Sequence, residues 1–260
     1  MIGHALVRPP GASFARALSS SQAVIDVTLA QAQHAEYRQA LVETGVTVEV
    51  LPPDERFPDS CFMQDPAMVI RGQAIINRPG AASRRGEEEG PAELLAARFP
   101  ATHIVAPGTL EGGDVMVLPD RVLVGRSGRT NRAGIAQLVV ALSAQDPKGF
   151  GNPSGLPVLE VPMASYLHLL SAATYLGDNI ILAAEDYADH PIFAGMRVLR
   201  VPPAEVYAVN TLAIGDRVIV PAGYPQVAAL LRANGFTLLP VPVSEFAKAD
   251  GGVTCLSLVW

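Results

Sequence analysis

The stretch V-L-E-V-P at residues 158–162 returns in altered form four more times along the chain. In each copy a short apolar run ends in proline, which is typical of a strand at the point where it leaves a sheet. The prolines stand at positions 52, 107, 162, 202 and 242, so the steps between them are 55, 55, 40 and 40 residues. Near-equal steps indicate an internal repeat of five units. The five runs are Val48–Pro52, Ile104–Pro107, Val158–Pro162, Val198–Pro202 and Leu238–Pro242.

The sequence around these runs repeats as well. Two apolar segments split by a turn follow most of the runs, as in Val115–Leu118 and Val122–Val124, and predict a hairpin. Helical or turn-closing sequence precedes each run, and the longest helix is expected over Gln22–Thr44. Because no unit could bury its own apolar face, the five should close around a shared centre. We therefore predict one α/β domain over residues 1–260, with Ser143–Pro157 as an inserted surface loop.

Composition and charge bound the class of protein. Of the 260 residues 49% are apolar and 17% are charged, which is typical of a compact globular chain. The net charge of −6 argues against a nucleic-acid partner and mildly favours a cationic small molecule. The sequence has no signal-peptide pattern and no apolar run of about 20 residues, so no membrane partner is expected. Two cysteines make no disulfide framework, and we expect a cytoplasmic protein with both thiols reduced.

The last thirteen residues, K-A-D-G-G-V-T-C-L-S-L-V-W, place a thiol in apolar sequence. The pattern predicts a buried strand over Val253–Val259 with Cys255 in its middle, entered through Gly251 and Gly252. Glycines before a strand allow the backbone to approach a ligand closely. Cys255 is then either a nucleophile on a pocket floor or a small core hydrophobe, and this stretch by itself leaves both interpretations open.

A reactive side chain follows the proline of each repeat. Closure of the five units would bring these side chains together at the centre, in a pocket with a thiol, an imidazole and carboxylates. The residues are Asp59, Asp65, Glu111, His168, Asn210 and Cys255.

Six motifs occur along the chain in this order: P-D-S-C-F-M-Q-D-P (58–66), R-P-G-A-A-S-R-R (78–85), E-G-G-D (111–114), G-R-S-G-R-T-N (125–131), L-H-L-L-S (167–171) and D-G-G-V-T-C (250–255). Together they resemble the motifs of the dimethylarginine dimethylaminohydrolases, members of the guanidino-group-modifying superfamily. The resemblance runs from about residue 5 to the C-terminus. It implies a five-bladed pseudosymmetric α/β propeller of ββαβ modules, the pentein fold, in agreement with the five-unit repeat.

The resemblance implies three catalytic residues. Cys255 would attack the guanidinium carbon as a thiolate, which needs an adjacent cation such as the substrate or protonated His168. His168 would protonate the departing amine and then activate water. Glu111 would orient His168 and favour its charged form.

The resemblance also implies the substrate contacts. Asp59 and Asp65 would accept the guanidinium N–H groups, because a planar fork of donors pairs well with carboxylates. Arg84 and Arg129 would hold the substrate's α-carboxylate, with the neighbouring Arg85 and Arg126 as alternatives for the same task. The backbone of Leu18 would meet the substrate's amino end.

The motif around the second aspartate adds a flap and two departures from the family pattern. Phe62 would cover the substrate. Gln64 stands where the family often has an acid, which removes one negative charge near the substrate. Cys61 occupies an apolar position and places a second thiol in the flap motif.

The implied reaction is hydrolysis of asymmetric dimethylarginine or monomethylarginine to citrulline and an alkylamine, through a covalent thiouronium on Cys255. No cofactor and no metal are expected, and the partner is a small guanidino amino acid bound by a monomer or a homodimer. Another guanidino or ureido amino acid, such as arginine or citrulline, is an alternative substrate. A non-catalytic ligand- or zinc-binding propeller is the alternative of another class, and it would require an inert thiol.

Overall fold

The computed structural model describes residues 2–21, 23–143 and 155–260, and within them fifteen strands form five three-stranded sheets. All five sheets share one plan, in which the middle strand runs antiparallel to one neighbour and parallel to the other. In four sheets the antiparallel pair is a hairpin formed by consecutive strands. In the fifth, β15 (Ser257–Val259) from the end of the chain pairs with β1 (His4–Val7) from its beginning.

The proline-ended runs form the third strand of each sheet, or directly follow it. The run Ile104–Pro107 is the one that follows its strand, because β5 ends at His103, whereas the other four runs overlap theirs. The third strands are β2 (Thr47–Val50), β5 (Ala101–His103), β8 (Val158–Pro162), β11 (Arg197–Val201) and β14 (Thr237–Val241). The hairpins are β3–β4 (Ala67–Ile70, Gln73–Ile76), β6–β7 (Val115–Val117, Val122–Arg126), β9–β10 (Ala173–Gly177, Ile180–Ala184) and β12–β13 (Leu212–Ile214, Arg217–Pro221).

Two connecting segments differ from the expected helices. The long first helix, α1, begins at Val27 because the Asp26 carboxylate caps it by accepting the Leu29 N–H at 3.0 Å. In the fourth unit, only the 3₁₀ turn Pro191–Phe193 lies between the hairpin and β11. The predicted repeat of strands is therefore more regular than the repeat of helices.

The expected strand over Val253–Val259 is wrong in its first half. Residues 254–256 form a 3₁₀ turn that carries Cys255, and β15 begins only at Ser257. The Cys255 N–H donates to the Gly252 carbonyl at 3.2 Å, so this N–H is bonded within the turn and does not pair with a neighbouring strand. Strand β1 ends at Val7, opposite Ser257, so the residues that precede Ser257 have no partner in β1.

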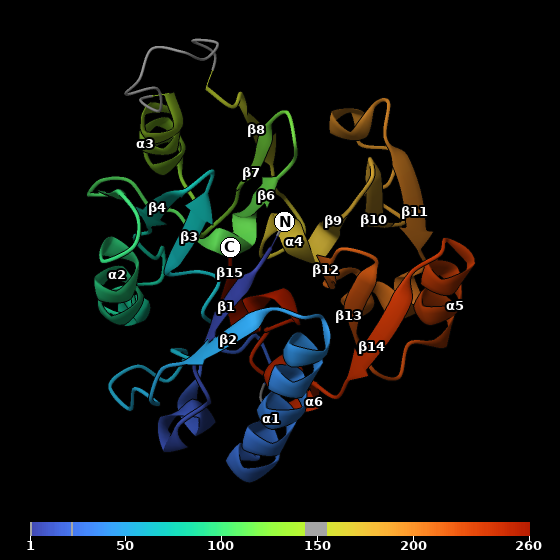
Figure 1. Ribbon diagram of the computed structural model, residues 1–260, viewed down its shortest axis with the longest axis horizontal. Helices are drawn as coiled ribbons and strands as arrows, with labels where there is room; N and C mark the ends of the chain where they lie inside the picture. Colours follow the sequence, from blue (N-terminus) through green and yellow to red (C-terminus); the bar gives the residue numbers. More distant parts are fainter. Residues whose placement is uncertain (1, 22, 144–154) are drawn as a thin grey trace. The chain divides into compact units, whose positions relative to one another are not determined.

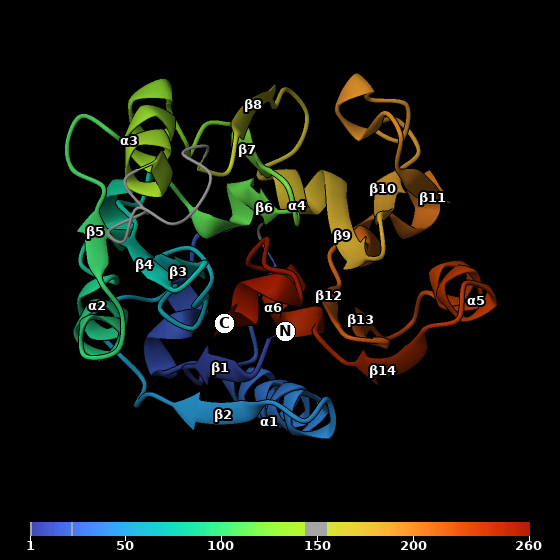
Figure 2. The same ribbon diagram turned by 45° about the horizontal axis from the view of Figure 1, so that its top comes forward.

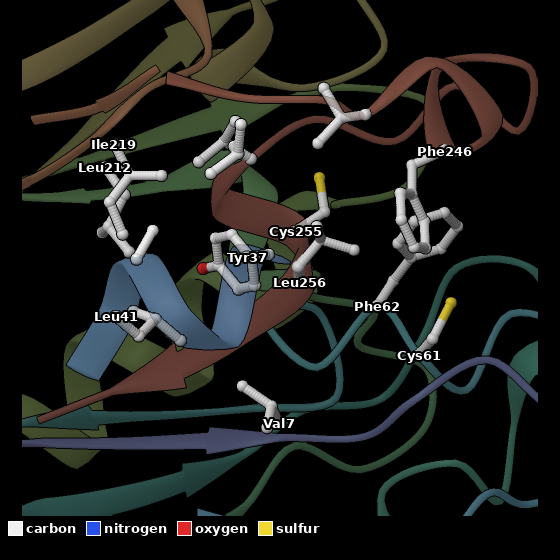
Figure 3. Close-up of a cluster of buried hydrophobic side chains, with 14 of the residues drawn as sticks. Val7, Tyr37, Leu41, Cys61, Phe62, Leu212, Ile219, Phe246, Cys255 and Leu256 are labelled. Atoms are coloured by element: carbon white, nitrogen blue, oxygen red, sulfur yellow. The ribbon is translucent and has the colours of Figure 1, made fainter. Parts of the chain in front are cut away.

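The first of two compact units contains residues 1–64 and 170–260. It holds the sheets β15-β1-β2, β9-β10-β11 and β12-β13-β14 with helices α1 (Val27–Glu43), α5 (Pro225–Ala233) and α6 (Ser244–Ala247). Figure 1 shows α1 beside β2, and Figure 2 shows α5 beside β14. Tyr37 and Leu41 of α1 contribute to the apolar core of this unit, which also contains Cys61, Phe62 and Cys255 (Figure 3).

The second unit contains residues 65–169. It holds the sheets β3-β4-β5 and β6-β7-β8 with helices α2 (Glu89–Ala96) and α3 (Arg132–Ser143), which pack on β4 and β8 respectively. Its own core is built around Ile75, Leu110, Val122 and Leu138. The short helix α4 (Leu169–Ala172) begins at the last residue of this unit.

Three expectations from the sequence concern the chain as a whole. The single catalytic domain over residues 1–260 stays a prediction. The predicted insertion Ser143–Pro157 falls for most of its length, residues 144–154, outside the described residues. No helix among the described residues combines the length and apolarity needed to cross a membrane.

Candidate functional site

A buried ion pair joins Glu111 and His168 in the second unit. Glu111 is the extended residue before the 3₁₀ turn Gly112–Asp114, and His168 directly precedes α4. The His168 Nε2 lies 2.9 Å from the Glu111 Oε2, and both side chains are buried. Burial by itself would lower the pKa of His168, but Asp65, the bond to Glu111 and Asp114 together raise it well above its usual value. The imidazole is therefore held as a cation.

Glu111 is the point where several donors meet. Burial would raise the pKa of Glu111, but the hydrogen bond from His168 and the charges of His168, Arg84 and Arg129 lower it. Its Oε1 also accepts the Gly80 N–H at 2.9 Å and lies 3.7 Å from the Arg129 Nη1. A carboxylate held in this way is a fixed negative charge that can orient an imidazolium ring.

Gly113 allows the His168 ring to lie directly on the backbone. A Cβ at this position would stand 2.6 Å from the His168 Nδ1, a separation that real atoms do not adopt. The Gly113 N–H donates to the Asp65 Oδ1 at 2.9 Å. The E-G-G-D motif thus places Asp65, Glu111 and His168 together.

Asp114 is a residue of this group that sequence reasoning passed over, although it closes the quoted E-G-G-D motif. It is completely buried, and its Oδ1 accepts the Leu169 N–H at 3.1 Å, directly after His168. Its Oδ2 accepts the Ser127 hydroxyl at 2.6 Å. The Ser127 Oγ accepts the Arg129 N–H at 3.0 Å in turn, so Asp114 links the segments that carry His168 and Arg129.

Arg84 lies in a buried network rather than at an exposed position. Its Nη1 donates to Asp65 at 2.7 Å, and its Nε and Nη2 donate to Glu87 at 3.0 and 2.8 Å. Burial would lower the pKa of Arg84, but Glu87 and Asp65 raise it, so the guanidinium stays charged. Glu87 was not singled out in the sequence; its signal is an acid three residues after Arg84.

The other arginines considered for the substrate's carboxylate are more accessible. Arg129 keeps about a quarter of its side chain exposed. Arg85 is exposed, and its Nε donates to the Pro79 carbonyl at 3.3 Å. Arg126 pairs with Glu160. Of the two arginines assigned by the resemblance, Arg129 is thus the one that solvent reaches more readily.

Asp65, Glu111 and His168 also have the composition of a metal site. Their ligand atoms all lie within 4.8 Å of one another. A metal ion would have to displace the proton of His168, because only the neutral imidazole is a ligand. The raised pKa of His168 works against that exchange.

Cys255 lies in the first unit, on a segment that we call the nucleophile turn, residues 251–255. Its side chain is 9% exposed. The Gly252 N–H points at the Cys255 Sγ at 3.3 Å, and the Gln64 N–H donates to the Cys255 carbonyl at 3.2 Å. A backbone N–H directed at sulfur favours the thiolate over the thiol.

The remaining predicted residues of this unit are Asp59, Leu18 and Phe62. The Leu18 N–H donates to the Asp59 carboxylate, at 3.1 Å to Oδ1 and 3.3 Å to Oδ2. The Phe62 ring is 4% exposed and makes edge contacts with Phe14 and Phe246, at centroid distances of 5.9 and 6.3 Å. The residue expected as a flap is here part of the apolar core (Figure 3).

The structure thus gathers the predicted residues in two groups. Asp65, Arg84, Glu111, Arg129 and His168 form a connected polar cluster within residues 65–169. Leu18, Asp59, Phe62 and Cys255 belong to the first unit.

Comparison with known proteins shows what the chain is similar to. The family model described as eukaryotic N,N dimethylarginine dimethylhydrolase matches residues 11–145. The N(G),N(G)-dimethylarginine dimethylaminohydrolase of Pseudomonas aeruginosa is 39% identical over 261 residues, which cover 99% of each chain.

Two solved structures match over 100% of both chains, at 38% identity and a TM-score of 0.94. One is a histidine-to-glycine variant of dimethylarginine dimethylaminohydrolase in an adduct with S-methyl-L-thiocitrulline. The other is a cysteine-to-serine variant of the Pseudomonas aeruginosa enzyme in complex with citrulline. The predicted fold class, a five-bladed α/β propeller of ββαβ modules, is confirmed by this likeness.

Proposed function

The chain belongs to the dimethylarginine dimethylaminohydrolase family, and from that premise we propose that it hydrolyses Nω-methylated arginine to citrulline and an alkylamine. The observation that carries the proposal is the buried Glu111–His168 ion pair, which holds an imidazolium ready to donate a proton. The partner is a small guanidino amino acid, and the described residues supply the acid, the base and the nucleophile without a cofactor.

In the first step the Cys255 thiolate attacks the guanidinium carbon and forms a C–S bond. The bond from that carbon to the methylated nitrogen then breaks, and the nitrogen takes the proton of His168 as it leaves. The products of this step are an alkylamine, a covalent thiouronium on Cys255 and a neutral His168. Glu111 keeps the imidazole oriented while its charge changes.

In the second step neutral His168 takes a proton from water, and the resulting hydroxide attacks the same carbon. The C–S bond breaks, the newly added hydroxyl group gives its remaining proton to solvent as the ureido carbonyl forms, citrulline is released, and the thiolate of Cys255 is restored. The Gly252 N–H at the sulfur stabilises the thiolate both as nucleophile and as leaving group. The cycle returns His168 to its protonated form.

The substrate-binding roles are part of the same proposal. Asp59 and Asp65 accept the guanidinium N–H groups, and Phe62 covers the substrate. Arg129 pairs with the substrate's α-carboxylate, and the exposure of the Arg129 side chain supports this role. Arg84 could bind the same carboxylate only if it reorganised its contacts with Asp65 and Glu87.

The test is citrulline release from asymmetric dimethylarginine, with monomethylarginine, arginine and agmatine measured alongside, on the wild type and on Cys255→Ser. We expect the methylated arginines to turn over fastest and the serine variant to be inactive. Cys61→Ser is the matched control, because it removes the other thiol of the chain, and it should remain active.

The outcomes separate the alternatives left open by the sequence. Fastest turnover of arginine or another guanidino compound, still dependent on Cys255, would keep the mechanism and change the substrate. The absence of turnover with every compound, from folded protein, would contradict the proposal and favour a non-catalytic binding role.

A further inference from the structure

Asn210 is a buried residue that has no role in the proposed reaction steps. It directly follows the 3₁₀ segment Pro203–Val209 and is 6% exposed. Its Oδ1 accepts the Thr254 N–H at 2.8 Å, and its Nδ2 donates to the Thr254 Oγ1 at 3.0 Å and to the Leu170 carbonyl at 3.1 Å. The carboxamide thus forms a closed pair of hydrogen bonds with the residue that precedes Cys255 in the chain.

The other side of the nucleophile turn rests on the same side chain. A Cβ on Gly252 would stand 2.4 Å from both the Cγ and the Oδ1 of Asn210, so the backbone lies directly against the carboxamide. Gly252 is also the residue whose N–H points at the Cys255 Sγ. Asn210 therefore contacts both Gly252 and Thr254, on either side of the segment that delivers the sulfur.

Two further contacts complete this support. The Tyr207 hydroxyl, from the same 3₁₀ segment, donates to the Gly251 carbonyl at 2.7 Å. The Thr254 Oγ1 donates to the Gln64 Oε1 at 2.8 Å, and the Gln64 N–H holds the Cys255 carbonyl. In this arrangement Gln64 supports the nucleophile turn through its amide oxygen.

We propose that Asn210 is a positioning residue for the nucleophile, which holds the turn so that the Gly252 N–H stays directed at the Cys255 sulfur. A merely structural asparagine would contribute to folding stability and leave the reactivity of the thiol unchanged. A positioning residue changes that reactivity, because a donor that leaves the sulfur no longer stabilises its charge. The inference rests on the proposed function only where it calls Cys255 the nucleophile.

The experiment measures the thiol directly, without substrate. The rate of alkylation of Cys255 by iodoacetamide is followed from about pH 5 to about pH 10 by mass spectrometry of the Cys255 peptide. For Asn210→Ala we expect the pH at which the alkylation rate rises to increase by about one unit. A shift of this size corresponds to the loss of one hydrogen bond to a charged group. On the methylated substrate, kcat should fall about tenfold with KM nearly unchanged.

Two controls separate positioning from stability. Glu205→Gln alters a buried carboxylate of the same 3₁₀ segment that contacts the N-terminus of α5, and it should leave the alkylation profile of Cys255 as in the wild type. Urea unfolding of Asn210→Ala is the second control, because it gives the loss of unfolding free energy separately from the shift of the alkylation profile.

A folded Asn210→Ala variant with the wild-type alkylation profile would overturn the proposal. If that variant does not fold, Thr254→Val decides in its place, since it removes the hydroxyl that links Asn210 to Gln64. Its profile must shift upward for the proposal to stand. A shifted profile in a protein that turns over no guanidino compound would support the positioning role and contradict only the proposed function.

Discussion

At the scale of single residues, the site depends on carboxylates whose charge is fixed by buried partners. Glu111 meets His168, Gly80 and Arg129, and its low pKa keeps it ionised. The charge of Asp65 and the hydrogen bond to Glu111 raise the pKa of His168, which is therefore a cation at neutral pH, the form that can protonate a leaving amine. The sequence predicted this pair from position and resemblance. The strength of the coupling follows from burial, which the sequence does not display.

Replacing Glu111 by Gln should change the titration of His168. The pKa of His168 is raised in the wild type, so the ring loses its proton only when the pH rises past that raised value. Without the Glu111 charge the ring should lose its proton at lower pH, and the falling limb of the kcat/KM profile should move down with it. We expect kcat to fall by about 100-fold.

Nuclear magnetic resonance of labelled imidazole gives the titration, and initial rates across pH give the profile. His103→Gln, which changes an exposed histidine, is the control that should leave both unchanged. An unchanged His168 titration in Glu111→Gln would contradict the electrostatic role of the carboxylate.

Arg84 and its neighbour Arg85 should differ in what their loss does. Arg84→Ala leaves two buried carboxylates, Asp65 and Glu87, without their shared cation, and should cost about 3 kcal/mol or more of unfolding free energy. Arg85→Ala changes an exposed side chain and should cost less than about 0.5 kcal/mol. Urea unfolding gives both values. A marginal effect of Arg84→Ala would show that the ion network contributes little.

At the scale of elements, the nucleophile turn shows how hydrogen bonds in the folded protein prevent a strand that the sequence pattern predicts. Apolar and β-branched residues predicted a strand through Cys255. In the structure, however, the Cys255 N–H donates to the Gly252 carbonyl, and the Thr254 N–H donates to the carboxamide oxygen of Asn210. Asn210 lies 44 residues away from its partner Thr254 in sequence. A hydrogen bond to so distant a residue cannot be read from the local sequence pattern. The predicted strand therefore begins too far toward the N-terminus.

Helix α5 depends in the same way on a distant residue. Its N-cap, Tyr224, makes no side-chain cap hydrogen bond, and the Glu205 carboxylate accepts the Gln226 and Val227 N–H groups at 3.1 and 2.8 Å instead. Glu205→Gln should therefore lower the unfolding free energy by about 1 kcal/mol. Thermal unfolding measures the change, and citrulline release should stay at the wild-type rate. A stability equal to that of the wild type would show that the remote cap is dispensable.

At the scale of the whole molecule, the ends of the chain complete one sheet. Strand β15 pairs with β1, with Ala5 opposite Val259, and the Trp260 ring stacks on His4 at 5.4 Å. The fifth sheet thus forms only when the two ends of the first unit meet. The other four sheets each come from one continuous segment of the chain.

The predicted single domain can be tested by the cooperativity of unfolding. Trp260 is the one tryptophan of the sequence and lies in the first unit, so its fluorescence reports on that unit. The imidazole resonance of His168 reports on the second. If residues 1–260 form a single domain, the two urea midpoints should coincide. Separate midpoints would show two independently unfolding units and contradict the prediction.

The five-unit repeat, the sheets and the family could all be read from the sequence. Strand patterns and prolines are local properties, and the motif residues keep their order, so both can be read without coordinates. Tertiary structure alone decided that Cys255 stands on a turn, that Arg84 is buried between Asp65 and Glu87, and that Asn210 holds Thr254. The physical reason is that burial and hydrogen-bond partnership arise between segments far apart in sequence, where no local pattern records them.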